Sequence, residues 1–179
     1  MIFEHRPDNL RVVSDKVQRL LKENEDELGI IMQPSSKSYI RFIPHAWDHV
    51  GNTHGYAWAG TSCMVVFEMG VGERRASLNI ISGKAPDAWL DPVWKLSENP
   101  PFHRSKWKKR PRQWCTLHST GAVRFDLAEA GIDELDGIAD KIYEKVRSSL
   151  QSANTQDVIT LIAGELPKLD EVCRAAASD

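Results

Sequence analysis

The spacing of apolar residues changes twice along this chain of 179 residues, and these changes constrain the fold more than any other feature of the sequence. Near the N-terminus apolar residues recur every three or four positions, in the middle they alternate, and in the C-terminal third helical spacing returns. Strands that cluster between helices, without β–α–β alternation, are typical of an α+β fold with an antiparallel sheet. We therefore expect one α+β domain over residues 1–179, with an N-terminal helix, about five strands and two or three C-terminal helices.

The helix expected first covers residues 9–26. Leu10, Val13 and Val17 lie on one helical face, together with further leucines one turn on. Asp8 precedes this stretch and is a suitable N-cap, because its carboxylate can accept a first-turn N–H. Gly29 follows the stretch and is expected to end the helix.

Five short stretches in the middle of the chain have strand character. Alternation or apolar runs bounded by glycine and proline predict strands over residues 39–43, 61–69, 76–80, 114–117 and 123–125. The second and third strands are expected to form a hairpin around residues 70–73. The last two are expected to form another hairpin that turns at residues 119–121.

Helical spacing then covers residues 135–150 and 158–166. Pro167 lacks a backbone N–H, so we expect it to break or kink the second of these helices. Residues 169–176 are expected to form a last short helix with Pro167 near its first position.

The composition is that of an ordinary globular protein, with 41% hydrophobic residues and a net charge of −2. No apolar run approaches the 18 residues that a membrane span needs, so no membrane association is expected. Residues 1–8 contain no apolar region and no small-residue cleavage site, so no secretory signal is expected there. The odd number of widely spaced cysteines argues against a disulfide framework and favours a cytoplasmic location. No motif indicates a cofactor.

The near-neutral total conceals a strong asymmetry. Residues 102–112, called here the basic segment, contain six Lys or Arg and no Asp or Glu, whereas residues 113–179 contain six basic and twelve acidic residues. Such a segment attracts phosphates and releases counterions, and its tryptophan can stack on a base. The residues expected to contact nucleic acid are Arg104, Lys106, Trp107, Lys108, Lys109, Arg110 and Arg112.

The same charges allow a second interpretation. The basic segment can pair with the acidic C-terminal helices, either within one chain or between two copies. A protein partner or a homodimer is therefore an alternative to nucleic acid.

A histidine cluster follows the strand over residues 39–43. Imidazoles and a carboxylate can hold a transition metal that activates water, so His45, Asp48, His49 and His54 are candidate ligands of a metal-dependent hydrolase. Their spacing matches no established zinc motif, and the alternative is a set of polar loop side chains.

Six tryptophans are many for this length. One interpretation is a small-molecule pocket against the sheet, lined by Trp58, Trp89 and Trp94. The alternative is that most of these indoles fill the core.

Several segments together resemble a region of uncharacterised bacterial proteins of the PD-(D/E)XK nuclease superfamily, where it lies downstream of the nuclease core. The matching segments are residues 6–10, 28–30, 38–47, 67–68 and 77–80. The resemblance covers most of the chain and implies an accessory module. Short proteins of this kind also resemble cargo of mobile gene cassettes.

The chain departs from that superfamily in the residues that catalysis needs. The nuclease core requires an acidic residue two positions before a lysine, and no lysine of this chain has Asp or Glu at that position. No nuclease residue can be carried over. The leading hypothesis is therefore a non-catalytic binding or accessory module that contacts nucleic acid or a nuclease-type partner through the basic segment.

Overall fold

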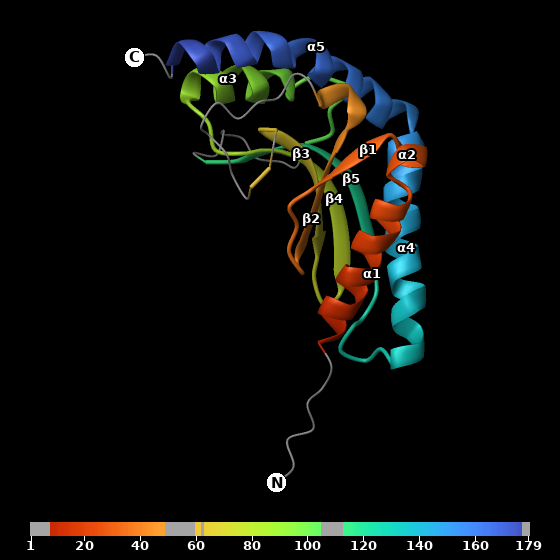
Figure 1. The fold of residues 1–179 in the computed structure, drawn as a ribbon. Coiled ribbons are helices and arrows are strands. Elements are labelled where there is room, and N and C mark those ends of the chain that lie inside the picture. Colours follow the sequence, from red (N-terminus) through yellow and green to blue (C-terminus); the bar gives the residue numbers. More distant parts are fainter. Residues whose placement is uncertain (1–7, 49–59, 62, 105–112, 177–179) are drawn as a thin grey trace.

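The sheet has five antiparallel strands that follow one another in chain order (Figure 1). The computed structural model describes residues 8–48, 60–61, 63–104 and 113–176. The strands are β1 (Ile30–Gln33), β2 (Tyr39–Pro44), β3 (Val65–Val71), β4 (Arg75–Ser82) and β5 (Cys115–Arg124). Together with the N-terminal and C-terminal helices, this meander confirms the predicted α+β fold.

Two long helices lie side by side along the sheet, α1 (Asn9–Glu23) and α4 (Ile132–Gln151) (Figure 1). They run parallel, and Lys16 of α1 forms ion pairs with Asp136 and Asp140 of α4 at 2.9 and 3.2 Å. Asp8 caps α1, as predicted, by accepting the N–H of Arg11. The first helix ends at Glu23 and not at residue 26 as predicted. A separate turn of helix, α2 (Glu25–Leu28), follows it and ends at Gly29, the predicted stop.

A second group of helices covers one end of the sheet, where α5 (Ala153–Ala176) lies over α3 (Asp87–Leu96) (Figure 1). The prediction that a separate short helix follows Pro167 was wrong, since α5 continues through this residue. Leu166 and Leu169, on either side of Pro167, are both buried. Their packing offsets the lost backbone hydrogen bond.

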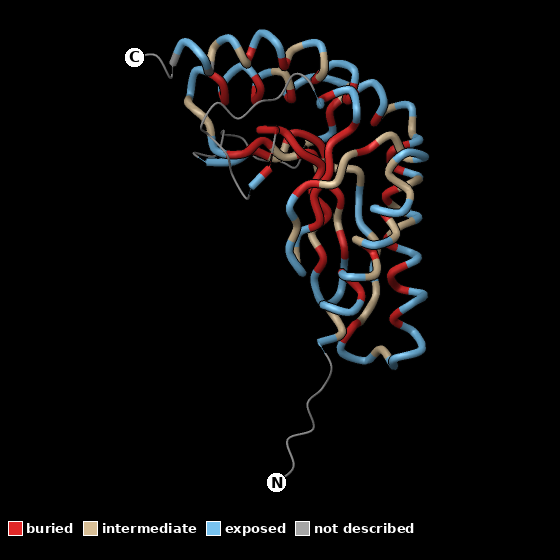
Figure 2. Tube along the Cα trace, in the orientation of Figure 1, coloured by how far each residue is buried: buried red, intermediate tan, exposed pale blue. Residues whose placement is uncertain are grey.

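An aromatic stack joins the sheet to α5. The rings of Phe42 and Phe67 stack across β2 and β3 with centroids 5.2 Å apart, and Trp47 stacks on Phe67 at 5.6 Å. Trp47 lies in a short 3-10 helix, η1 (His45–Trp47), and its indole N–H donates to the carbonyl of Ile159 in α5. Figure 2 shows buried residues along the strands and on the inward sides of the helices. The core thus lies between the sheet and the helices.

The predicted second hairpin is wrong, because residues 115–124 form one continuous strand along β4. The register shifts twice, and between the pairs Ser77–Ala122 and Asn79–Ser119 strand β5 carries one residue more than β4. A β-bulge absorbs the extra residue. Gly121, with φ of +94°, lies in this bulge and not in a turn.

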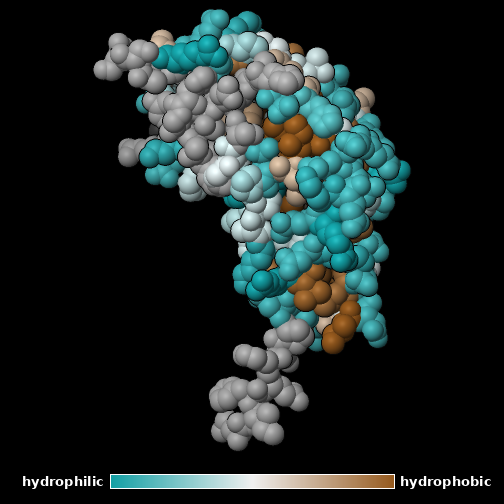
Figure 3. All heavy atoms as spheres, viewed as in Figure 1, coloured by the Kyte–Doolittle hydropathy of each residue, from teal (hydrophilic) through white to brown (hydrophobic). Residues whose placement is uncertain are grey.

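Strand β1 was not expected from the sequence, because four residues are too few for a clear alternation. No helix within the described ranges is both long and apolar enough to cross a membrane. The surface over α1 and α4 is mostly hydrophilic, apart from an apolar patch near the lower ends of these helices (Figure 3).

Candidate functional site

Arg104 is the described cation of the basic segment, and its guanidinium already has structural partners. It lies 3.5 Å from the ring centroid of Trp94, donates to Ser97 Oγ at 3.3 Å and forms an ion pair with Glu98 at 3.6 Å. A guanidinium held over an aromatic face in this way is a fixed point of the structure. Arg104 therefore anchors the start of the basic segment to α3.

The other candidate nucleic-acid contacts lie outside the described residues. They are Lys106, Trp107, Lys108, Lys109, Arg110 and Arg112.

The chain after the basic segment carries an exposed indole. Trp114 is 57% exposed, whereas the next residue, Cys115, is fully buried at the start of β5. The sequence placed Trp114 at the start of the strand predicted over residues 114–117 and among tryptophans expected mostly to fill the core, and the polar Gln113 before it was the available signal for exposure. A large aromatic side chain held by a buried neighbour is suited to stacking.

Residues 102–104 are attached to the outer edge of β5. The N–H of Ser119 donates to the carbonyl of His103 at 2.7 Å, and the N–H of His103 donates to Nδ1 of His118 at 2.9 Å. His118 is almost completely buried, and burial, followed by the nearby His103, lowers its pKa to about 4. His118 is therefore neutral at pH 7 and able to accept this hydrogen bond.

A polar pocket of about 240 Å³ lies where α4 passes into α5, beside β5. Its lining side chains are hydroxyl-bearing, amide or basic, and none of those described is acidic. They belong to His103, His118, Ser119, Thr120, Lys145, Ser148, Ser149, Ser152, Asn154 and Thr155. Sequence analysis missed this pocket, because its residues come from four separate parts of the chain.

Two features of the pocket give it positive character. Lys145 Nζ donates to the carbonyl of Thr120 at 2.6 Å and forms no ion pair with a described residue. The first turn of α5 also borders the pocket, and the N-terminal end of a helix carries partial positive charge. The pocket can therefore accept an anion.

The sheet also carries a row of polar residues at matched register. Gln33, Arg41, Glu68, Asn79 and Ser119 occupy neighbouring positions on the five strands. Arg41 Nε donates to Glu68 at 2.8 Å, and Ser119 Oγ donates to Asn79 at 2.6 Å. Burial raises the pKa of Glu68 although the Arg41 guanidinium opposes this shift.

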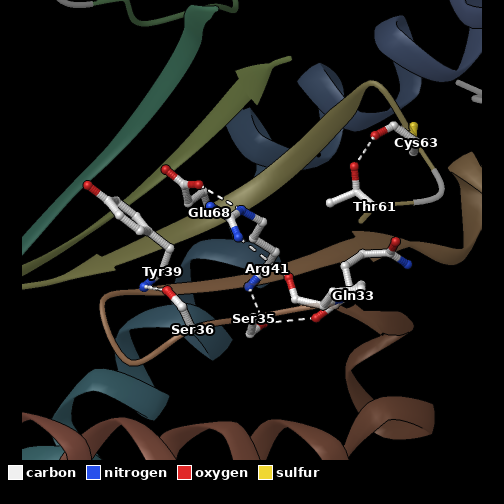
Figure 4. A network of polar contacts seen from close by, with 9 residues as sticks. Gln33, Ser35, Ser36, Tyr39, Arg41, Thr61, Cys63 and Glu68 are labelled. Carbon is white, nitrogen blue, oxygen red and sulfur yellow. Dashed lines mark hydrogen bonds and ion pairs between the residues drawn. The ribbon is translucent and has the colours of Figure 1, made fainter. Parts of the chain in front are cut away.

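The loop between β1 and β2 fixes the position of Arg41 in this row (Figure 4). Ser35 Oγ accepts the backbone N–H of Arg41 at 2.9 Å and donates to the carbonyl of Gln33 at 2.8 Å. The Cζ atom of the Arg41 guanidinium also lies 5.4 Å from the ring centroid of Tyr39. The pair of Arg41 and Glu68 is thus part of the sheet's structure.

The predicted metal ligands lie partly outside the described residues. His45 and Asp48 are exposed in and beside η1, whereas His49 and His54 belong to the part of the chain that is not described. Within the described ranges, no three His, Cys, Asp or Glu side chains group closely enough to hold a metal ion. The metal centre stays a prediction.

The predicted tryptophan pocket is also only partly described. Trp89 and Trp94 are buried on α3, and Arg104 covers the ring of Trp94. Trp58 lies outside the described residues. The two described indoles contribute to the core, and small-molecule binding stays a prediction.

Comparison with known proteins does not assign this arrangement. No family model, curated protein or solved structure matches the chain. The resemblance to the nuclease-associated region therefore stays a prediction.

Proposed function

We propose that this protein is a non-catalytic accessory module that binds single-stranded nucleic acid through Trp114 and the basic segment. The exposed indole of Trp114, two positions after the last cation of that segment, is the observation that carries the proposal. Aromatic stacking together with a cluster of cations is how proteins bind single strands without reading their sequence. In an intact duplex the bases are already stacked on one another, which favours a single strand as ligand.

The fixed ends of the basic segment support this function. Arg104 is held by Trp94 and Ser97 before it, and Cys115 is held in β5 after it. Anchored ends reduce the conformational entropy that binding must remove from the segment.

The role is binding and not cleavage, because the chain lacks the acidic residue before a lysine that the nuclease core requires. An accessory role beside a nuclease is what the resemblance implies. A cytoplasmic location is part of the same proposal.

The test is fluorescence anisotropy with labelled single-stranded and double-stranded DNA and RNA, between about 50 and 200 mM salt. We expect single strands to bind more tightly than duplexes and Trp114→Ala to weaken single-strand binding about tenfold, within the range for one stacked base. Lys108→Ala with Arg110→Ala should lower the slope of log affinity against log salt by about 1 to 2.

A matched control removes one lysine and one arginine elsewhere. Arg19→Ala with Lys168→Ala changes the net charge equally at exposed helical positions and should leave the salt slope nearly unchanged. The proposed function is wrong if no oligonucleotide binds at low salt, or if both double variants weaken binding equally.

A further inference from the structure

One face of the sheet is open to solvent at the end where β3 turns into β4. Burial alternates along β4 in this region: Ala76 and Leu78 are fully buried in the core, whereas Arg75 is exposed and Ser77 is half-buried. Successive side chains of a strand point to opposite faces of a sheet. Residues that share the face of Arg75 and Ser77, called here the open face, can therefore contact a ligand.

Tyr39 is an exposed aromatic side chain on the open face. It pairs with Gly70, which pairs with Ser77, so the three residues share one face. Tyr39 is 48% exposed, and a Cβ built on Gly70 would lie 4.0 Å from its ring, so this neighbour leaves the ring uncovered. The Arg41 guanidinium, held by Glu68, restrains the ring from one side. A restrained and accessible ring is suited to stacking.

Two arginines face each other across the same end of the sheet. Arg75 of β4 is directly opposite Arg124 of β5, and both are exposed. Neither forms an ion pair with another residue in the described part of the chain. Like charges directly opposite on neighbouring strands repel each other. An anionic group bound at this pair would remove the repulsion.

The nearest carboxylates have partners of their own. Arg124 borders a pocket on the α4 side, whose acidic lining residues are Asp126, Glu129 and Glu134. Asp126 forms an ion pair with Arg74 at 3.9 Å, and Glu134 accepts the backbone N–H of Gly131 at 2.9 Å. These contacts leave the two arginines available for an external anion.

We propose that a single strand of nucleic acid crosses the open face, where Tyr39 stacks on a base and Arg75 and Arg124 contact phosphates. An exposed aromatic ring beside unpaired cations is the combination that binds single strands without reading their sequence. The half-buried Asn79 and Ser119 lie between these groups and add polar contacts. This inference rests on the function proposed above and extends its site beyond Trp114.

The register of the strands connects this surface with Trp114. Cys115 pairs with the fully buried Ser82, so Trp114, one residue earlier, belongs to the open face. Because Tyr39 is level with Ser77, the two aromatic residues are about 20 Å apart along the strands. They are also separated across the sheet from β2 to β5. A strand of several nucleotides spans this path, within the site size of about 4 to 16 nucleotides for one small binding fold.

The test compares labelled oligothymidylates of about 4 and about 12 nucleotides by fluorescence anisotropy. We expect Tyr39→Ala to weaken binding of the longer probe about tenfold. It should leave the shorter probe nearly unchanged, because four nucleotides do not reach from Trp114 to Tyr39. Arg75→Gln with Arg124→Gln should lower the salt slope of the longer probe by about 1 to 2.

Matched variants control for structural effects. Tyr39→Phe keeps the ring and should bind as the wild type does. Arg11→Gln with Arg19→Gln removes the same charge from exposed positions on α1 and should leave the salt slope nearly unchanged. Thermal melts show whether each variant is folded, and the variant of Arg75 and Arg124 keeps the test decisive if Tyr39→Ala unfolds.

The outcomes separate this inference from the proposed function. If Trp114→Ala weakens binding while the variants of Tyr39, Arg75 and Arg124 change neither probe, the path across the open face is overturned and the proposed function stands. If those variants weaken the longer probe but Trp114→Ala does not, the open face binds nucleic acid and the site proposed at Trp114 fails. If no oligonucleotide binds the wild type, both fail.

A polyglutamate of matched charge tests whether the open face binds an acidic protein instead. We expect it to bind more weakly than the longer oligonucleotide, because it has no bases to stack on Tyr39. Equal binding of the two polymers, unchanged by Tyr39→Ala, would overturn the nucleic-acid path and favour an acidic protein partner.

Discussion

At the scale of single residues, the buried polar groups carry the clearest energetic consequences. Arg41 and Glu68 have side chains only 11% and 10% exposed, and each compensates the charge of the other. Removing one partner of such a pair leaves a buried charge without compensation, which costs more than the pair contributes.

We therefore expect Arg41→Met to lower the free energy of unfolding by about 3 kcal/mol. Urea denaturation measures this change. The double variant Arg41→Met with Glu68→Met should recover most of the loss, because no buried charge remains. A double variant as unstable as the single one would contradict this account.

The neutral state of His118 makes stability depend on pH. Its pKa is about 4 in the folded protein and about 6.5 in the unfolded chain, so between these values the unfolded chain binds more protons. Folding stability should therefore fall as pH decreases from 6.5 to 4, by up to about 3 kcal/mol from this group.

His118→Asn should flatten that pH dependence. The side-chain oxygen of Asn can accept the backbone N–H of His103, but the Asn side chain does not titrate. Urea denaturation at several pH values between 4 and 7 measures the effect. His45→Gln, at an exposed histidine, is the control and should leave the profile nearly unchanged. Equal pH profiles for wild type and His118→Asn would rule out this role of His118.

At the scale of elements, local signals located β2, β3 and β4, but they missed β1 and misjudged how β5 continues. Serine, threonine and glycine at residues 119–121 are typical of a turn, which is why a hairpin was predicted. Pairing with β4 along its whole length keeps β5 extended, and the glycine is used for a bulge. Pro167 shows the same effect in α5, where packing decides the continuity of the helix.

Two glycine substitutions should have opposite effects on stability. Gly121→Ala forces alanine to φ near +94° and brings a Cβ to 3.5 Å from Lys145 Nζ, so we expect a loss of about 1 to 2 kcal/mol. Gly137→Ala in the open middle of α4 should gain about 0.5 to 1 kcal/mol. Thermal denaturation compares the two, and a stabilised Gly121→Ala would exclude the strained bulge.

At the scale of the whole molecule, charge is distributed unevenly along a chain with a net charge of only −2. The basic segment and the acidic C-terminal third can attract each other between two copies. Interactions between exposed charges are screened over about 10 Å at 0.1 M salt.

Self-association through these charges should therefore weaken with salt. Sedimentation velocity is expected to show a dimer at about 50 mM salt and dissociation toward monomer at about 300 mM. Lys108→Ala with Arg110→Ala should shift the low-salt protein toward monomer. A monomer at both salt concentrations would contradict the homodimer expected from the sequence.

The sequence by itself determined the fold class, the cap at Asp8, the stop at Gly29, the first hairpin and the location of the basic segment. These features depend on the spacing of hydrophobic residues and on local hydrogen bonds, and residues close together in the sequence specify both. Only the tertiary structure decided the continuity of β5 and α5, the stacking of Arg104 on Trp94, and the pocket shared by His103, Lys145 and Ser149. Those features depend on contacts between residues far apart in the chain, and no local pattern encodes them.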